Sequence, residues 1–176
     1  DSRHRKLLNR LLEILCEDGL LLRHDSTWEV RLPLQRQDAS ALAEVLVHEH
    51  PDSEPEVVLV QRFGEHLAQG LRGAANPLDL LFPGGSLEDA SRLYRDAPFT
   101  RGFNLLAGEV VQALLKSNGS GRSPRILEIG AGTGGTTEHV LAALGDAPVD
   151  YTFTDISLLF LNQAQRRFRG RSGMQF

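Results

Sequence analysis

The sequence predicts an α/β protein in which a mostly helical N-terminal segment precedes the first part of a doubly wound parallel sheet. Helical periodicity dominates the chain up to about residue 115, and a polar connector follows at 117–123. Beyond the connector, a short apolar strand runs into a glycine-rich turn, and helix, strand and helix follow in that order. We therefore expect a helical subdomain at 1–120 and a sheet-forming part at 121–176.

The helical segment begins with an amphipathic pattern in which leucines recur at helical spacing opposite charged residues. Gly19 is expected to end this first helix, and two short strand candidates, 20–22 and 28–32, then suggest a small winged-helix-like hairpin. Asn76-Pro77 and Pro83-Gly84-Gly85 predict loops, and Ser86 predicts an N-cap with acids in the following turn. The expected helices of this segment span residues 3–17, 38–50, 56–71, 87–94 and 103–115.

The second part reads as two strand–helix units. The expected elements are a strand at 125–129, a helix at 136–144, a strand at 150–154 and a helix at 158–168. This alternation is typical of the opening of an open parallel sheet, which binds ligands at the carboxyl ends of its strands.

The composition is ordinary for a soluble globular protein, with 41% hydrophobic and 24% charged residues. A net charge of −4 argues against a global attraction to nucleic acid or to an anionic membrane. We find neither an apolar run long enough to span a bilayer nor a signal-peptide pattern. Because Cys16 is the single cysteine, no internal disulfide can form, and a reduced, cytoplasmic setting is expected.

The glycine-rich turn and the acid that follows the next strand predict a nucleoside-binding crevice. Gly130 and Gly132 allow a sharp turn that approaches a ligand closely, and the next helix points its free N–H groups at the same crevice. Asp155, about twenty residues further on, can accept both hydroxyl hydrogens of a ribose.

The same glycines also satisfy the dinucleotide fingerprint, so a nicotinamide cofactor is an alternative ligand. Glu128 favours a cationic, amine-bearing ligand such as S-adenosylmethionine, because a carboxylate there would repel a pyrophosphate. Thr133, Thr136 and Thr137 would give the crevice a polar lining. A structural glycine turn without a ligand is the third interpretation.

The motifs around this turn closely resemble the methyltransferase domains of modular polyketide synthases. The residues that carry the resemblance are ILEIGAGTGGTTEHVL at 126–141 and YTFTDISLLFLNQAQRRF at 151–168. Upstream, LLNRLLEILCEDGLL at 7–21 and FPGGSLEDASRLYRDAPFTRGFN at 82–104 resemble the helical lid of those domains. The resemblance covers nearly the whole chain and implies a Rossmann-like class I methyltransferase core behind a helical lid.

This resemblance implies methyl transfer from S-adenosylmethionine, with S-adenosylhomocysteine as the product, to a polyketide intermediate on an acyl carrier protein. The acceptor in the C-methylating branch is the α-carbon of a β-ketoacyl thioester, which attacks the methyl group as an enolate. The resemblance assigns cofactor binding to one set of residues, Glu128, Gly130, Ala131, Gly132 and Asp155. Tyr94 and Asn104 fall in the lid and are candidates for contacts with the substrate, and the neighbouring synthase domains would be further partners.

The chain departs from the family pattern because the histidine and glutamate assigned to C-methylation are absent from its 176 residues. His139 is unrelated in position to the family's base, so the catalytic base is expected beyond Phe176 and this chain by itself is expected to be inactive. An O-methyltransferase of the same synthase type, a non-catalytic pseudo-methyltransferase domain that spaces neighbouring enzymes and a ketoreductase fragment are the alternatives.

Two other clusters are considered and given no leading role. His48, Glu49 and His50 are adjacent on a helix and so point to different faces, and no metal site is predicted. Basic residues gather near the end of the last helix, where the helix dipole favours cations, and docking of an acidic carrier protein is a secondary interpretation. These residues are Arg166, Arg167, Arg169 and Arg171.

Overall fold

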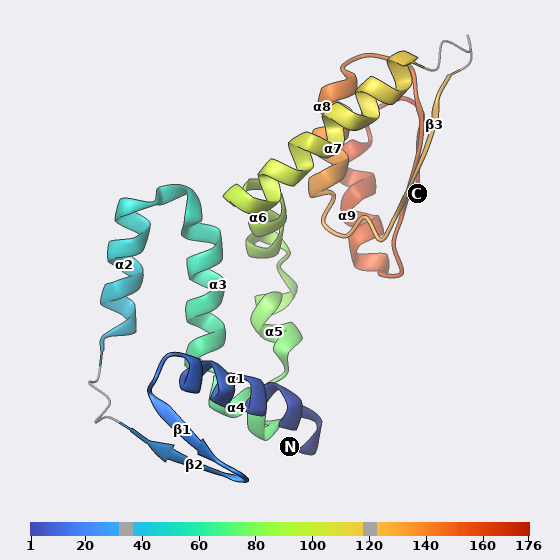
Figure 1. The fold of residues 1–176 in the computed structure, drawn as a ribbon. Helices are drawn as coiled ribbons and strands as arrows, with labels where there is room; N and C mark the ends of the chain where they lie inside the picture. Colours follow the sequence, from blue (N-terminus) through green and yellow to red (C-terminus); the bar gives the residue numbers. More distant parts are fainter. Residues whose placement is uncertain (32–36, 118–122) are drawn as a thin grey trace.

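The computed structural model describes residues 1–31, 37–117 and 123–176. Helices make up most of the first part, and a three-stranded parallel sheet with helices on one side forms the second (Figure 1). Among the described residues, no helix combines the length and the apolar character needed to cross a membrane. The α/β fold class is confirmed.

The N-terminal unit is one helix followed by a hairpin. After a short 3-10 turn at Ser2–His4, α1 spans Arg5–Glu17, and Gly19 follows it in a left-handed conformation (φ 73°), as expected of a helix stop. Strand β1 (Leu21–His24) pairs antiparallel with β2 (Thr27–Val30), with Leu21 opposite Val30. The hairpin is therefore confirmed, although residue 32 of the second expected strand lies outside the described residues.

The next helices form an antiparallel pair that stands apart from the sheet in Figure 1. Asp38 caps α2 by accepting hydrogen bonds from two backbone N–H groups of its first turn. The single helix expected at 56–71 is wrong, because the chain breaks at His66 into two helices. The elements are α2 (Ala39–Glu49), a 3-10 turn (Pro51–Ser53), α3 (Glu54–Glu65) and α4 (Leu67–Arg72).

Three helices lead from this pair to the sheet. Asn76 lies in a loop, as expected, but its side chain caps a short helix that was not predicted, α5 (Pro77–Leu81), and Pro77 lies in the first turn of that helix. The loop at 83–85 is a single 3-10 turn. The N-cap of α6 (Glu88–Asp96) is Leu87 instead of the expected Ser86, although the Ser86 hydroxyl accepts a hydrogen bond from the Glu88 N–H. Helix α7 (Pro98–Ser117) starts five residues before the expected position, at a proline suited to a helix start.

The sheet has the order β3-β4-β5, and both pairs of strands are parallel. Strands β3 (Arg125–Ile129) and β4 (Asp150–Thr154) and helix α9 (Leu158–Phe168) have the predicted bounds, and α8 (Gly135–Leu144) begins one residue early. The sequence did not predict β5 (Met174–Gln175), because two residues carry no periodicity.

The core of this part lies between the sheet and its helices. Phe153 on β4 is fully buried and Tyr151 is 2% exposed, and both belong to an apolar cluster with α8 and α9. Helix α7 packs on α8 so closely that a Cβ at Gly108 would lie 2.9 Å from the His139 carbonyl oxygen. On the other side of the sheet, Leu127 and Ile129 are 62% and 82% exposed. Within the described residues, helices thus cover one face only (Figure 1).

Helix α7 precedes the expected boundary near residue 120, yet it packs on the α/β part. The boundary itself falls at residues 118–122, outside the described residues. The division into 1–120 and 121–176 therefore stays a prediction.

Candidate functional site

A cavity of about 600 Å³ opens where the glycine-rich turn leaves β3. Its walls come from the turn and the start of α8, from the end of β4, from α9, and from α5, α6 and α7. The lining residues are Leu81, Phe82, Tyr94, Phe99, Thr100, Phe103, Asn104, Gly130, Ala131, Gly132, Thr133, Gly135, Thr136, Asp155 and Phe160. The helical segment and the sheet thus build this cavity together.

The turn requires glycine for its backbone conformation. Gly130, Gly132 and Gly134 have φ values of 70°, 57° and 77°, in the left-handed region that other residues rarely adopt. The N–H group of Ala131 donates to the carbonyl oxygen of Thr154, 2.9 Å away, and so ties the turn to the end of β4. The glycine turn after β3 is held in this way to the last residue of the neighbouring strand.

Asp155 holds the turn through its side chain. One carboxylate oxygen, Oδ2, accepts a hydrogen bond from the Gly132 N–H at 2.9 Å, and Oδ1 accepts one from the Ser157 N–H at 2.8 Å. Each oxygen of a carboxylate can accept a second hydrogen bond. The structure therefore places a fixed, half-buried carboxylate at the cavity wall with capacity left for two donors.

Glu128 points away from this cavity. Its Oε2 accepts hydrogen bonds from the Tyr151 hydroxyl at 2.7 Å and from the Thr137 hydroxyl at 2.6 Å, both on the covered side of the sheet. Burial, and next the adjacent Glu128 carboxylate, raise the pKa of Tyr151. Thr137 was expected to line the crevice, but it is fully buried against Glu128, whereas Thr133 and Thr136 do line the cavity. Direct contact between Glu128 and a ligand stays a prediction.

The two lid candidates both reach the cavity, in different ways. Tyr94 is 49% exposed and lines the wall from α6. Asn104 is 7% exposed and joins three helices: its amide donates to the Tyr94 carbonyl at 2.8 Å, and its Oδ1 accepts from the Thr136 hydroxyl at 2.7 Å. Asn104 thus positions Tyr94 and the start of α8, and a contact with substrate stays a prediction.

Comparisons with known proteins match this arrangement. A family described as "Methyltransferase domain" matches residues 127–176. The non-reducing polyketide synthase nvfA of Aspergillus novofumigatus is 35% identical over 98% of the chain, and the methylphloroacetophenone synthase of Cladonia uncialis is 34% identical over 99%. Among solved structures, the CurJ carbon methyltransferase aligns over 98% of the chain with a TM-score of 0.87 and 34% identity. The CMeT domain of the citrinin polyketide synthase aligns over 99% with a TM-score of 0.91 and 30% identity.

The chain belongs to the methyltransferase domains of polyketide synthases. It spans 8% and 7% of the lengths of the two synthases and 46% and 47% of the two solved chains. The match therefore covers one part of a methyltransferase domain, and that part includes the glycine turn and the helical lid.

Four aromatic side chains of this methyltransferase cavity were not predicted from the sequence. The rings of Phe82 and Phe160 meet edge to face at 6.0 Å, and those of Phe99 and Phe103 lie 4.9 Å apart. Phe99 and Phe103 are 70% and 60% exposed, which is unusual for such large apolar residues. The sequence offered one signal, the phenylalanines at helical spacing in the lid motif, but only the fold shows that they meet α9 at one cavity.

The junction between the lid and the turn depends on Gly135. A Cβ there would lie 2.7 Å from the Tyr94 carbonyl oxygen, which also accepts the Asn104 hydrogen bond. We expect Gly135→Ala to lower the free energy of unfolding by about 2 kcal/mol, because backbone must shift to relieve the overlap. Urea unfolding measures this change. Gly102→Ala, which meets no atom within 4 Å, is the matched control, and equal stability of the two variants would contradict the role of Gly135.

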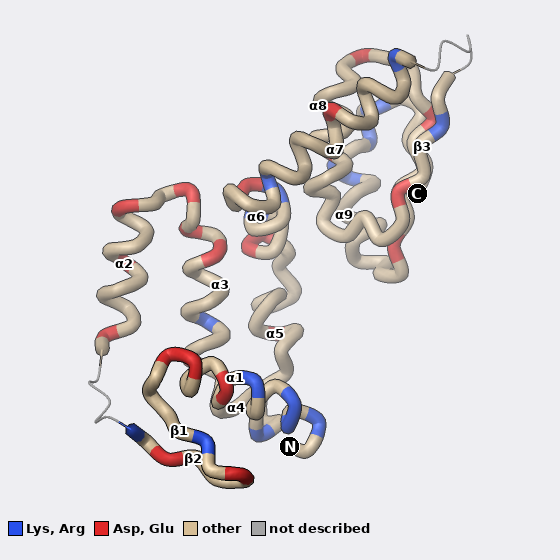
Figure 2. The backbone as a smooth tube through the Cα atoms, viewed as in Figure 1, with Lys and Arg blue, Asp and Glu red and all other residues tan. Residues whose placement is uncertain are grey.

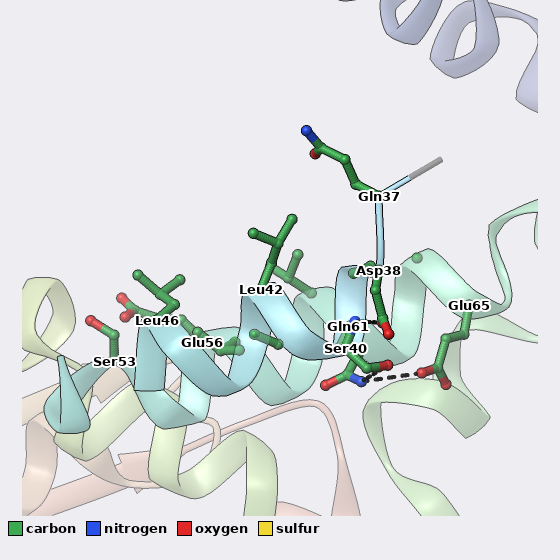
Figure 3. A pocket seen from close by; sticks show the side chains of 14 residues that line it. Gln37, Asp38, Ser40, Leu42, Leu46, Ser53, Glu56, Gln61 and Glu65 are labelled. Atoms are coloured by element: carbon green, nitrogen blue, oxygen red, sulfur yellow. Dashed lines mark hydrogen bonds between the residues drawn. The ribbon is translucent and has the colours of Figure 1, made fainter. Parts of the chain in front are cut away.

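A larger cavity, about 980 Å³, lies between α2 and α3 (Figure 3). Leu42, Leu46 and Val60 line it and are 54%, 44% and 73% exposed. Acidic positions predominate on these two helices (Figure 2). Its described lining residues include neither a nucleophile with an adjacent base nor a glycine turn.

No group of three or more possible metal ligands occurs in the part of the chain that the structure describes, which includes His48, Glu49 and His50. The Nδ1–H group of His139 donates to the Gly135 carbonyl oxygen at 2.9 Å, and His139 does not line the cavity.

Proposed function

We propose that this domain binds S-adenosylmethionine in the cavity at the glycine turn and methylates a polyketide intermediate held on an acyl carrier protein. The acceptor that we propose is the α-carbon of a β-ketoacyl thioester. The observation that carries the proposal is the Asp155 carboxylate, fixed by the Gly132 and Ser157 N–H groups at the cavity wall. Two solved relatives are named carbon methyltransferases, and the trans-methyltransferase CalH, 27% identical with a TM-score of 0.54, was solved in complex with SAH.

The residues of the cavity suit such a cofactor. A volume of about 600 Å³ falls in the range of small-molecule sites. Asp155 can accept the two hydroxyl hydrogens of a ribose with the lone pairs that its backbone bonds leave free. The aromatic walls offer ring faces to a cation and an apolar surface to an adenine ring. We assign the contacts with the cofactor to Gly130, Ala131, Gly132 and Asp155, and an indirect role to Glu128.

S-adenosylmethionine supplies an electrophilic methyl group on a sulfonium. The chain orients that ligand through Asp155 and the glycine backbone, and the phenylalanine side chains exclude water from the crevice. We place the substrate on the lid side, next to Tyr94. The base that takes the α-proton is proposed to lie beyond Phe176, as the family resemblance implies, and the neighbouring synthase domains to deliver the carrier protein.

Calorimetric titration of the full-length protein with S-adenosylhomocysteine tests the cradle. We expect Asp155→Ala to weaken binding about tenfold or more, since the hydrogen bonds to ribose and the anchor of the turn are lost together. Asp150→Ala removes an equally charged but exposed side chain at the start of β4 and is expected to bind like the unmodified protein. Equal affinities of the two variants would overturn the assignment of Asp155.

The acceptor is tested separately with S-adenosylmethionine labelled in its methyl group and a carrier-bound β-ketoacyl thioester. Label on the α-carbon of the product supports the proposal, and label on oxygen favours the O-methylating alternative. A folded full-length protein that binds S-adenosylhomocysteine but methylates neither position would favour the non-catalytic alternative.

A further inference from the structure

A third cavity, of about 710 Å³, lies between α6 and α9, and we name it the α6–α9 cavity. Four guanidinium groups and one carboxylate line it: Arg92, Arg95, Arg166, Arg167 and Glu88. Figure 2 shows basic positions along α6 and beside α9. An excess of cations in a concave site raises the local concentration of anions.

Three of these four arginines are held in place by carboxylates. Arg95 pairs with Asp96 at 2.6 Å, Arg92 with Glu54, and Arg167 with Glu138. A guanidinium has five donors, so each of these arginines keeps donors for another acceptor. Arg166 is exposed and has no carboxylate within ion-pair distance among the described residues.

Arg167 and Arg95 also lie close enough to repel each other. Burial, and next the charge of Arg95, lower the pKa of Arg167, although Asp96 opposes this effect. The repulsion between two cations that line one cavity is relieved by an anion bound between them. The cavity is thus lined by positioned cations, of which Arg166 has no carboxylate within ion-pair distance among the described residues.

Two buried polar atoms in the same walls lack partners. Ser91 is 9% exposed, and neither its Oγ nor the Oε1 of Gln163 has a hydrogen-bond partner among the described residues. Both residues line the α6–α9 cavity. Buried polar atoms in native proteins are nearly always hydrogen-bonded, so these two need a partner that the described residues do not supply. The Ser91 hydroxyl can donate to an anion, and Gln163 Oε1 can accept from an N–H or O–H of an organic group.

The α6–α9 cavity shares helices α6 and α9 with the cavity at the glycine turn. The glycine-turn cavity is lined by Tyr94, which precedes Arg95 on α6, and by Phe160, which lies about one helical turn before Gln163 on α9.

We propose that the α6–α9 cavity binds a phosphate ester. The ester has two possible sources, a free small molecule or the phosphodiester that tethers an acyl group to a carrier protein. The second source rests on the proposed function. In either case Arg166 and Arg167 contact the phosphate, and Ser91 donates to it.

Calorimetric titrations of the full-length protein with pantetheine 4′-phosphate and with pantetheine test the proposal, because the two probes differ only in the phosphate. We expect the phosphorylated probe to bind and pantetheine to bind at least about tenfold more weakly. Equal affinities, or no binding of the phosphorylated probe, would overturn the proposal. S-adenosylhomocysteine is titrated into the same sample, so that failure of the proposed cofactor site is recognised separately.

Charge variants decide where the phosphate binds. Arg166→Gln is expected to weaken binding about fivefold, and Glu88→Gln to strengthen it about twofold, because each changes one charge in the cavity wall. Arg169→Gln removes the same charge from an exposed position on the same helix end, outside the cavity lining, and should change the affinity less than about twofold. An equal loss in the Arg166 and Arg169 variants would show non-specific attraction and overturn the site.

The carrier-bound source is tested with an acyl carrier protein with and without its phosphorylated arm. Tighter binding of the protein with the arm, lost in Arg166→Gln, supports the tether as the ligand. Equal binding of both forms would overturn that source and leave the free ester.

Discussion

Replacing Glu128 with alanine is expected to lower the free energy of unfolding by about 3 kcal/mol, the combined cost of leaving two buried hydroxyl groups without an acceptor. Tyr151 is 2% exposed and Thr137 fully buried, and both donate to the same carboxylate oxygen. Urea unfolding of the full-length protein measures the change. A Glu128→Ala variant as stable as the unmodified protein would contradict this account.

The partner hydroxyls supply the control for this prediction. Adding Tyr151→Phe and Thr137→Val to Glu128→Ala should recover most of the lost stability, because no buried hydroxyl is then left unpaired. Glu128→Gln keeps the shape and one acceptor and should destabilise by about 1 kcal/mol. If Glu128→Gln weakens binding of S-adenosylhomocysteine at unchanged stability, Glu128 contacts the ligand directly.

Gly173→Ala is expected to cost about 3 kcal/mol of stability, from a left-handed backbone and a severe overlap together. Gly173 has φ 78°, and a Cβ there would lie 2.0 Å from the Val149 carbonyl oxygen. The Gly173 carbonyl oxygen accepts a hydrogen bond from the Tyr151 N–H at 2.8 Å, and the pairing of β5 with β4 starts there.

Gly170→Ala is the matched control, since a Cβ at this position meets no atom within 4 Å. It should leave the urea midpoint unchanged or raise it slightly, because alanine restricts the unfolded chain. Equal midpoints for Gly173→Ala and the unmodified protein would show that the β4–β5 edge adapts without cost.

Helices α6 and α9 each contribute side chains to both cavities, aromatic residues to one and arginines to the other. Helix α6 carries Tyr94 towards the glycine-turn cavity and Arg92 and Arg95 towards the α6–α9 cavity. Helix α9 does the same with Phe160 and Arg166. The face of the helix on which a substituted residue lies therefore determines which of the two cavities the substitution changes.

The sequence by itself determined the α/β fold class, the bounds of β3, β4 and α9, and the motif that belongs to polyketide synthase methyltransferase domains. These features are local. Neighbouring residues are sufficient to specify a short apolar strand, a run of glycines with positive φ or an amphipathic helix.

Only the tertiary structure decided which side chains meet. Phe82 and Phe160 are far apart in the chain, yet their rings meet in one wall of the cavity. Glu128 accepts hydrogen bonds from Tyr151 and Thr137 instead of lining the cavity. The two-residue strand β5 exists because β4 offers it a partner. Contacts of this kind depend on how helices pack on a sheet, and no local period of the sequence encodes that packing.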